Sequence, residues 1–267
     1  MSIYRPCTQE ERTRYAPEVR GNVVFNGNKY WIVKNVGIST GEERIEFLAF
    51  NLGYKIVNIA EVKLLNDEEM KQIRGLIDED FSDKVSYLIR LGGSYTLNDL
   101  PIKELEEAVA MELVFSLWIM RRDTHARNRE YVEDRIPIFF DHGTSFLREP
   151  TSQDIEKFFQ RSGEGHAGSW RVVERSGGSI TTAQAREKNV DFHYVNNLSK
   201  FEQVLDYLKK EFRNKVPSDW QQILLSSNLT HYSPVEEIVE ALKNNLNTID
   251  KRIDRMKEVI FQNTKPN

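Results

Sequence analysis

The sequence has a single cysteine, Cys7, among its 267 residues. One cysteine cannot close a disulfide within the chain, and it cannot supply the several thiolates of a cysteine-based zinc site. No window approaches the roughly 18 consecutive apolar residues of a membrane span, and residues 1–6 lack the apolar core of a signal peptide. From these absences we expect a protein of the reducing cytoplasm with no membrane span.

Neither sign of charge dominates the chain. Lys and Arg number 37 and Asp and Glu number 41, which gives a formal net charge of −4. This mild acidity offers no support for nucleic acid or an anionic membrane as the main partner. Hydrophobic residues make up 39% and charged residues 29%, a balance typical of globular proteins. The chain is long enough to bury a full hydrophobic core without disulfide or metal cross-links. It could form one large domain or two small ones.

The first third of the chain predicts a small β-sheet. Two β-rich runs, 22–25 and 29–36, flank an Asn-Gly turn and therefore predict a β-hairpin. In the second run, side chains alternate between the two faces, so that Lys34 shares a face with Ile32. Further strands are expected over 56–65 and 84–91.

One helix is expected between these strands. Its apolar residues recur at helical spacing, with Gly53 as the stop signal, and they are Ile45, Leu48, Ala49 and Leu52. After residue 92 helices dominate. The run 105–120 is apolar on nearly all sides and predicts a buried helix. The runs 201–212 and 235–261 predict amphipathic helices, the second with a capping box that starts at Ser233 and Pro234 at its first helical position.

Three polar residues stand out as candidates for chemistry: Asp123, Asn128 and Asp141. Between Asn128 and Asp141 the chain reads as two short strands joined by a turn, and such a hairpin would bring Asp141 back alongside Asn128. Carboxylate and carboxamide oxygens are ligands that Mg²⁺ prefers. The spacing therefore predicts a magnesium site formed by side chains from the two ends of a hairpin.

The order of these residues matches a known pattern. Arg-Asp-x-x-x-x-Asn at 122–128, followed after a hairpin by Asp-x-Gly at 141–143, matches the catalytic loop and metal-binding motif of protein-kinase-type phosphotransferases. The loop reads Asp-x-His-x-x-Asn and the second motif reads Asp-His-Gly-x-Ser-Phe, and in this form the sequence resembles the HipA-like branch of atypical Ser/Thr kinases, related to the phosphoinositide kinases. The resemblance covers roughly Val23 to Phe146.

The resemblance implies roles for residues of both halves of the chain. Asp123 would be the catalytic base, and Asn128 and Asp141 would hold Mg²⁺. Lys34 would contact the phosphates of ATP, with Glu46, or else Glu42 or Glu43, as its partner. The backbone of one segment would bind adenine: Leu88, Ile89, Arg90 and Leu91.

The implied fold is α+β: a two-lobed protein-kinase-like fold with a small β-rich N-lobe over 1–92 and a mainly helical C-lobe over 93–267. ATP and Mg²⁺ would bind between the lobes. Several features depart from ordinary protein kinases, because no G-x-G-x-x-G precedes Lys34, Arg121 replaces the catalytic-loop histidine, and His142 replaces the phenylalanine of the metal motif.

The expected activity is transfer of the γ-phosphate of ATP to Ser or Thr of a protein substrate. Two alternatives stay open: a lipid or small-molecule kinase of the phosphoinositide-kinase type, and a kinase-like nucleotide-binding regulatory module without turnover. The resemblance also allows a regulatory or antitoxin partner. The sequence does not identify the acceptor.

Overall fold

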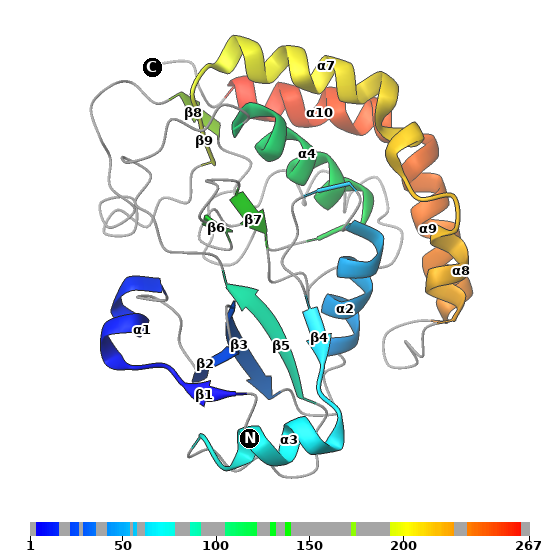
Figure 1. Ribbon diagram of the computed structural model, residues 1–267. Coiled ribbons are helices and arrows are strands. Elements are labelled where there is room, and N and C mark those ends of the chain that lie inside the picture. Colours follow the sequence, from blue (N-terminus) through cyan, green and yellow to red (C-terminus); the bar gives the residue numbers. More distant parts are fainter. Residues whose placement is uncertain are drawn as a thin grey trace.

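The computed structural model describes residues 4–15, 22–26, 29–35, 42–53, 56–57, 62–77, 86–91, 105–121, 129–131, 137–139, 172–174, 193–226 and 234–262. Figure 1 shows an α+β arrangement, with an antiparallel sheet on one side and a group of long helices on the other. Among the helices that lie in these ranges, none is long and apolar enough to span a bilayer.

The five-stranded sheet has the order β1-β2-β3-β5-β4, and all its pairs are antiparallel. Its strands are β1 (Arg5–Pro6), β2 (Asn22–Asn26), β3 (Lys29–Asn35), β4 (Val62–Leu64) and β5 (Ser86–Leu91). The predicted β2–β3 hairpin is confirmed, because Asn26 pairs with Lys29 and Val24 pairs with Trp31. The alternating apolar pattern places the buried Val24 and Trp31 opposite each other on adjacent strands.

In its described part, the N-terminal half contains the helices α1 (Gln9–Tyr15), α2 (Glu42–Gly53) and α3 (Asp67–Arg74). Helix α3 begins at a capping box, in which the Asn66 side chain accepts from the Glu69 N–H and the Glu69 side chain accepts from the Asn66 N–H. Helix α3 and the sheet share a hydrophobic cluster: Tyr4, Val24, Trp31, Val33, Leu65 and Ile73.

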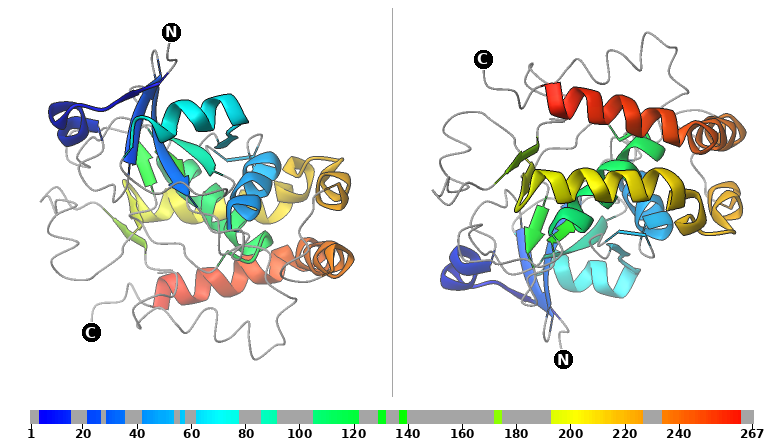
Figure 2. Two further views of the ribbon diagram at one scale, coloured as in Figure 1. Left: turned by 90° about the horizontal axis from the view of Figure 1, so that it is seen from below. Right: turned by 90° about the horizontal axis from the view of Figure 1, so that it is seen from above.

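The C-terminal half contains five helices in the described ranges: α4 (Leu105–Trp118), α7 (Leu198–Lys215), α8 (Trp220–Leu225), α9 (Val235–Asn247) and α10 (Ile249–Gln262). The buried helix predicted at 105–120 is confirmed as α4, which packs against α7, α9 and α10. Helices α7 and α10 lie side by side over α4 (Figures 1 and 2).

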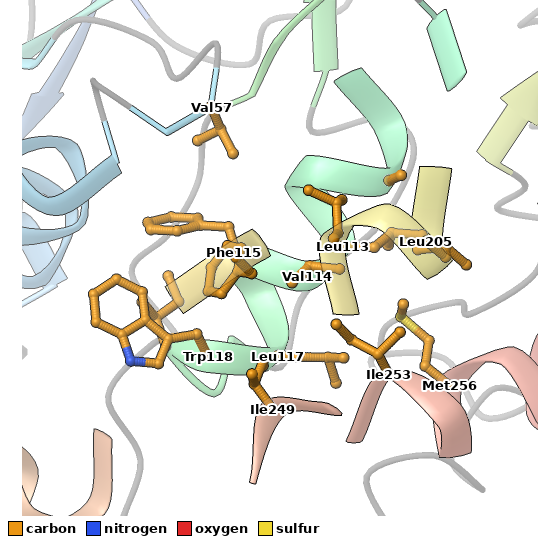
Figure 3. Close-up of a cluster of buried hydrophobic side chains, with 14 of the residues drawn as sticks. Val57, Leu113, Val114, Phe115, Leu117, Trp118, Leu205, Ile249, Ile253 and Met256 are labelled. Carbon is orange, nitrogen blue, oxygen red and sulfur yellow. The ribbon is translucent and has the colours of Figure 1, made fainter. Parts of the chain in front are cut away.

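The hydrophobic core of this half is centred on α4, whose side chains are buried on nearly all sides. Figure 3 shows Leu113 and Leu117 of α4 near Leu205 of α7 and Ile253 and Met256 of α10. All five side chains are almost fully buried. Burying a large aliphatic side chain contributes about 1.5–3 kcal/mol, so a helix apolar on all sides is stable only where neighbours cover every side.

Two pairs of short strands complete the description. Strands β6 (Arg129–Tyr131) and β7 (Pro137–Phe139) form an antiparallel pair, and β7 contacts α4. Strands β8 (Val172–Glu174) and β9 (His193–Val195) pair in parallel. In Figure 1 the β6–β7 pair lies between the sheet and α4.

The end of the chain differs from the prediction of a single helix over 235–261. The helix is interrupted at Thr248, which has φ −109° and separates α9 from α10. Arg213 of α7 donates hydrogen bonds to the carbonyls of Leu246 and Asn247 (3.0 and 2.9 Å). These carbonyls are at the end of α9, so a side chain from another helix stabilises the break.

Two other boundaries differ as well. Pro234 is the N-cap of α9, not its first helical residue, and it makes no side-chain cap hydrogen bond; Ser233 lies outside the described residues. The strand predicted at 56–65 is the shorter β4, because the N–H groups of Ile56 and Val57 bond to the Gly53 carbonyl in a turn after α2.

Helix α2 connects the two halves. It contacts β4 of the sheet and α8 of the helical half. Its buried residues Leu48, Ala49 and Leu52 belong to the large cluster of the C-terminal half, although they precede residue 92. The domain boundary predicted at residue 92 lies outside the described residues and stays a prediction.

Candidate functional site

Two of the predicted site segments lie on neighbouring strands. Lys34 is in β3, the middle strand of the sheet, and its backbone pairs with Tyr87 of β5. The predicted adenine-binding segment, Leu88–Leu91, forms the rest of β5 next to β3. The backbone of the predicted phosphate lysine is therefore adjacent to the strand predicted to hold the adenine.

The residues of the predicted adenine-binding segment differ in how many neighbouring strands their backbones pair with. Leu88 and Ile89 pair with β3 on one side and with β4 on the other. Arg90 and Leu91 pair with β3, and β4 ends opposite Ile89 at Val62. Within the described sheet, Arg90 and Leu91 are therefore the residues of this segment that pair with β3 but not with β4.

Glu46 is the fifth residue of α2, which starts at Glu42, and it therefore lies on the second turn of the helix. The side chains of Glu46 and of Lys34 are outside the described part of the structure. What the structure does describe is the support of α2, because Leu48 and Leu52 on the next turns are buried at 3% and 0% exposure. Helix α2 is thus fixed on its apolar face.

Asp123, Asn128 and Asp141 lie outside the described residues. The hairpin predicted between Asn128 and Asp141 is confirmed, because β6 and β7 pair with Arg129 opposite Phe139. In the sequence, Asn128 is the residue before β6, and Asp141 is the second residue after β7.

The segment before Asp123 is fixed by the end of α4. Met120 has φ 55°, in the left-handed region, and the N–H of Arg121 donates to the Ser116 carbonyl at 3.0 Å. This combination is a Schellman motif, which usually has glycine at the left-handed position. The chain therefore leaves α4 in one defined direction, two residues before Asp123.

A buried ion pair lies at the same place. The Arg121 guanidinium donates to a Glu112 carboxylate oxygen at 2.5 Å, and the two side chains are 1% and 2% exposed. The Ser116 hydroxyl donates to the same Glu112 oxygen at 3.4 Å. Both charged groups belong to α4 or its terminus, so the pair ties the start of the following loop to the helix interior.

Further polar contacts hold the end of α4 against the C-terminal helices. The Trp118 indole N–H donates to the Leu242 carbonyl at 3.2 Å, and the Asn245 amide donates to the Trp118 carbonyl at 3.0 Å. The Arg252 guanidinium lies 3.5 Å from the Met120 sulfur. The terminus of α4 is therefore anchored to both α9 and α10.

Glu112 is not among the site residues predicted from the sequence. The available signal is an acidic residue in a helix that is apolar on nearly all sides, nine residues before an arginine. A charge in such a position is expected to be paired, because an isolated buried charge is very unfavourable. The spacing alone does not identify Arg121 as the partner, because nine residues exceed the reach of ordinary pairs along one helix.

The metal site predicted by the sequence has no counterpart among the described residues. In that part of the chain, no three His, Cys, Asp or Glu side chains gather where they could hold a metal ion. The predicted ligands Asn128 and Asp141 are elsewhere in the sequence. Their donor atoms, a carboxamide oxygen and carboxylate oxygens, are of the kind that Mg²⁺ prefers.

Cys7 is no candidate nucleophile. It is half-buried, and burial raises the pKa of its thiol to about 11. The thiolate is the reactive form of cysteine, so at neutral pH Cys7 is an unreactive, protonated thiol.

No protein-family model matches this sequence, and no curated protein matches it. Among solved structures, the chain is similar to CtkA, a proinflammatory kinase of Helicobacter pylori, with 14% sequence identity and a TM-score of 0.46. The match covers 90% of this chain and 92% of that chain. A likeness this distant carries no functional argument.

Proposed function

We propose that this protein is an ATP- and Mg²⁺-dependent phosphotransferase of the HipA-like type, which transfers the γ-phosphate of ATP to Ser or Thr of a protein. The proposed site combines Lys34 and Glu46 from the N-terminal half with Asp123, Asn128 and Asp141 from the helical half. The proposal rests on the motifs in the sequence together with the arrangement of the strands that flank them.

The β6–β7 pair is the observation that carries this proposal. Consecutive Cα atoms are about 3.8 Å apart, so the chain keeps Asn128 within about 4 Å of Arg129 and Asp141 within about 7 Å of Phe139. Arg129 and Phe139 are partners across the ladder. The connectivity therefore allows a carboxamide and a carboxylate at these positions to approach one cation, as the proposed metal site requires.

In the proposed mechanism, the residues of the chain position the reactants and stabilise charge. Asp123 accepts the hydrogen bond of the attacking hydroxyl and directs its oxygen at the γ-phosphorus. Lys34 offsets negative charge on the phosphates of ATP, and Glu46 orients Lys34. Asn128 and Asp141 would hold Mg²⁺, which when bound would supply positive charge beside the transferred group. Catalysis of this kind rests mainly on positioning and electrostatics.

The ladder of β5 favours one part of the predicted adenine segment. Adenine is recognised by backbone groups that no neighbouring strand uses. Leu88 and Ile89 lie between β3 and β4, whereas in the described part of the sheet Arg90 and Leu91 pair with β3 alone. We therefore assign the adenine contact to the backbone of Arg90 and Leu91.

The proposal is tested with labelled ATP. The purified protein is incubated with Mg²⁺ and γ-labelled ATP, with and without a candidate protein mixture and with lipid vesicles, and label is measured separately in protein, lipid and free phosphate. We expect label on Ser or Thr in the protein fraction. The Asp123→Ala variant should lose about 10²–10⁴-fold in rate, the usual contribution of a positioned acid–base group.

Asp134→Ala is the matched control, because Asp134 lies between β6 and β7 in the sequence and has no proposed role. It should retain wild-type transfer. Label found in the lipid fraction alone would replace the protein-kinase proposal by the lipid-kinase alternative. Tight nucleotide binding without any transfer would replace it by the regulatory module.

A further inference from the structure

We propose that the buried Glu112–Arg121 pair positions the catalytic loop of this enzyme, so that Glu112 and Arg121 are positioning residues for Asp123. The inference rests on the phosphotransferase function proposed above, and it adds to the proposed site two residues of α4 and its C-terminal end that determine the position of Asp123. Neither residue is proposed to touch ATP or the acceptor.

The pair lies at the end of α4, next to the segment that contains Asp123. Arg121 is the last described residue of its segment, two residues before Asp123, and its guanidinium is held by Glu112 in the interior of α4. Its backbone N–H is held by the Ser116 carbonyl. Both the backbone and the side chain of Arg121 are therefore fixed to the same helix, and the direction of the chain towards Asp123 is defined.

Both residues that flank the segment 122–128 in the sequence belong to the described part of the structure. The segment 122–128 starts at the anchored terminus of α4 and ends at Arg129, the first residue of β6. The partner strand β7 contacts α4 as well. A change in how Arg121 is held therefore alters the position at which the chain enters the segment 122–128, while β6 fixes the position at which the chain leaves it.

The chemistry of the buried Glu112–Arg121 pair also favours a positioning role. Replacing a buried ion pair with apolar residues of similar volume often leaves stability unchanged or raises it, whereas removing one partner is strongly destabilising. Stability alone therefore gives no reason for two charges at this place. A short, charge-assisted hydrogen bond does define one geometry, which a set of apolar contacts specifies less sharply.

The decisive variant is the double substitution Glu112→Leu/Arg121→Met. Each single substitution leaves a buried charge without its partner and should lower Tm markedly, and the double variant should recover a Tm near that of the wild type. Its kcat for phosphoryl transfer should nevertheless fall by about 10²-fold, the effect of a small misplacement of a catalytic group. The KM for ATP should change by less than about threefold, because nucleotide binding does not depend on Asp123.

Glu106→Gln is the matched control. Glu106 is also a buried acid of α4, 1% exposed, but it lies at the opposite end of the helix, where its carboxylate accepts from the backbone N–H groups of Asn196 and Asn197 (2.7 and 2.9 Å). This variant should lower Tm and keep the wild-type kcat when assayed well below its own Tm. A purely structural role of the Glu112–Arg121 pair predicts that the double variant also keeps the wild-type kcat.

The outcomes separate this inference from the proposed function. A folded double variant with wild-type kcat would overturn the positioning role and leave the phosphotransferase function intact, provided that Asp123→Ala is inactive. A wild-type protein that transfers no phosphate would overturn both. If the double variant does not fold, Arg121→Lys decides, because it keeps a cation beside Glu112 while losing the planar guanidinium. A folded Arg121→Lys variant should have a reduced kcat, and wild-type kcat in it would refute the positioning role.

Discussion

At the scale of single residues, Met120 shows how a locally unfavourable conformation persists. Its φ of 55° is strained for a residue with a side chain, by roughly 1–2 kcal/mol. The side chain is 3% exposed, and its sulfur lies beside the Arg252 guanidinium. Burial of the methionine side chain, worth about 1.5–3 kcal/mol, outweighs the strain, so a residue other than glycine is stable at the end of α4.

We expect Met120→Ala to destabilise the protein by about 2–5 kcal/mol, the usual effect of truncating a buried Met. Met120→Gly removes more side chain but relieves the left-handed strain, so it should be more stable than Met120→Ala by about 1 kcal/mol. In an ordinary helix interior the order would be reversed, because glycine is about 1 kcal/mol less favourable than alanine there. Urea unfolding of the three proteins measures the difference, and an alanine variant more stable than the glycine variant would contradict the account.

At the scale of elements, α3 is held to the sheet by a small polar cluster at its first turn. Glu69 caps the helix, accepts from the buried Tyr4 hydroxyl at 3.0 Å and pairs with the Lys63 ammonium. Burial alone would raise the pKa of Glu69, but the bonds from Lys63, the Asn66 N–H and Tyr4 outweigh it and lower this pKa below 4.5. Burial and the Glu69 carboxylate together raise the pKa of Tyr4.

The lowered pKa of Glu69 makes this cluster sensitive to acid. A carboxylate whose pKa is lower in the folded state stabilises the fold fully above its unfolded pKa of about 4.3, and this stabilisation is lost as the pH falls through the folded value. At pH 7 we expect Glu69→Gln to lower the free energy of unfolding by about 1.5–3 kcal/mol, the range for hydrogen bonds to charged groups. The difference from wild type should shrink steadily as the pH is lowered below 4.

The control for this prediction is Glu68→Gln, on the exposed side of the same helical turn. It should change stability by less than about 0.5 kcal/mol, as surface substitutions usually do. Urea unfolding of the three proteins between pH 7 and pH 3 provides the measurement. A Glu69→Gln difference that stays constant over this range would refute a role for the Glu69 charge.

At the scale of the whole molecule, α2 packs against both the sheet and the helical half and so couples the stability of the two. It contacts β4 on one side and α8 on the other, and Leu52, which is fully buried, belongs to the cluster of the helical half. Figure 1 shows α2 between the sheet and helices α8 and α9. In the proposed function this helix carries Glu46, so the packing of the C-terminal half supports a residue of the N-terminal half.

We therefore expect Leu52→Ala to destabilise both halves together, by about 2–5 kcal/mol. Hydrogen exchange measured by mass spectrometry should become faster in peptides from β2 and α3 as well as in peptides from α4 and α7. Leu225→Ala in α8 is the control, because Leu225 is 49% exposed and the same substitution there should have little effect. Faster exchange confined to the helical peptides would mean that the two halves unfold independently.

Elements with strong local signals could be predicted from the sequence. The β2–β3 hairpin follows from two β-rich runs around an Asn-Gly turn, and the β6–β7 pair follows from two short strands around a turn. Helix α4 follows from a run that is apolar on nearly all sides. Helix α2 ends at Gly53, as its stop signal predicts. In each case the residues that decide the structure lie within one stretch of the chain.

Other features were missed because distant residues decide them. The break at Thr248 is stabilised by Arg213, 33 and 34 residues before the carbonyls that it binds. Helix α3 is an exception among the missed features, because its Asn66–Glu69 capping box is a local signal. The parallel pairing of β8 and β9 joins strands about 20 residues apart and has no local signature.

The amino-acid order by itself determined the local elements and the sequence of polar motifs that suggest phosphoryl transfer, because hydrophobic periodicity and turn chemistry act over a few neighbouring residues. Only the tertiary structure decided that Glu112 meets Arg121 in the interior of α4, that α2 packs against α8, and that α9 ends where Arg213 reaches it. These contacts depend on which helices pack against one another. The burial of apolar surface drives this packing but is non-directional, so a local stretch of sequence does not specify which distant helix becomes its neighbour.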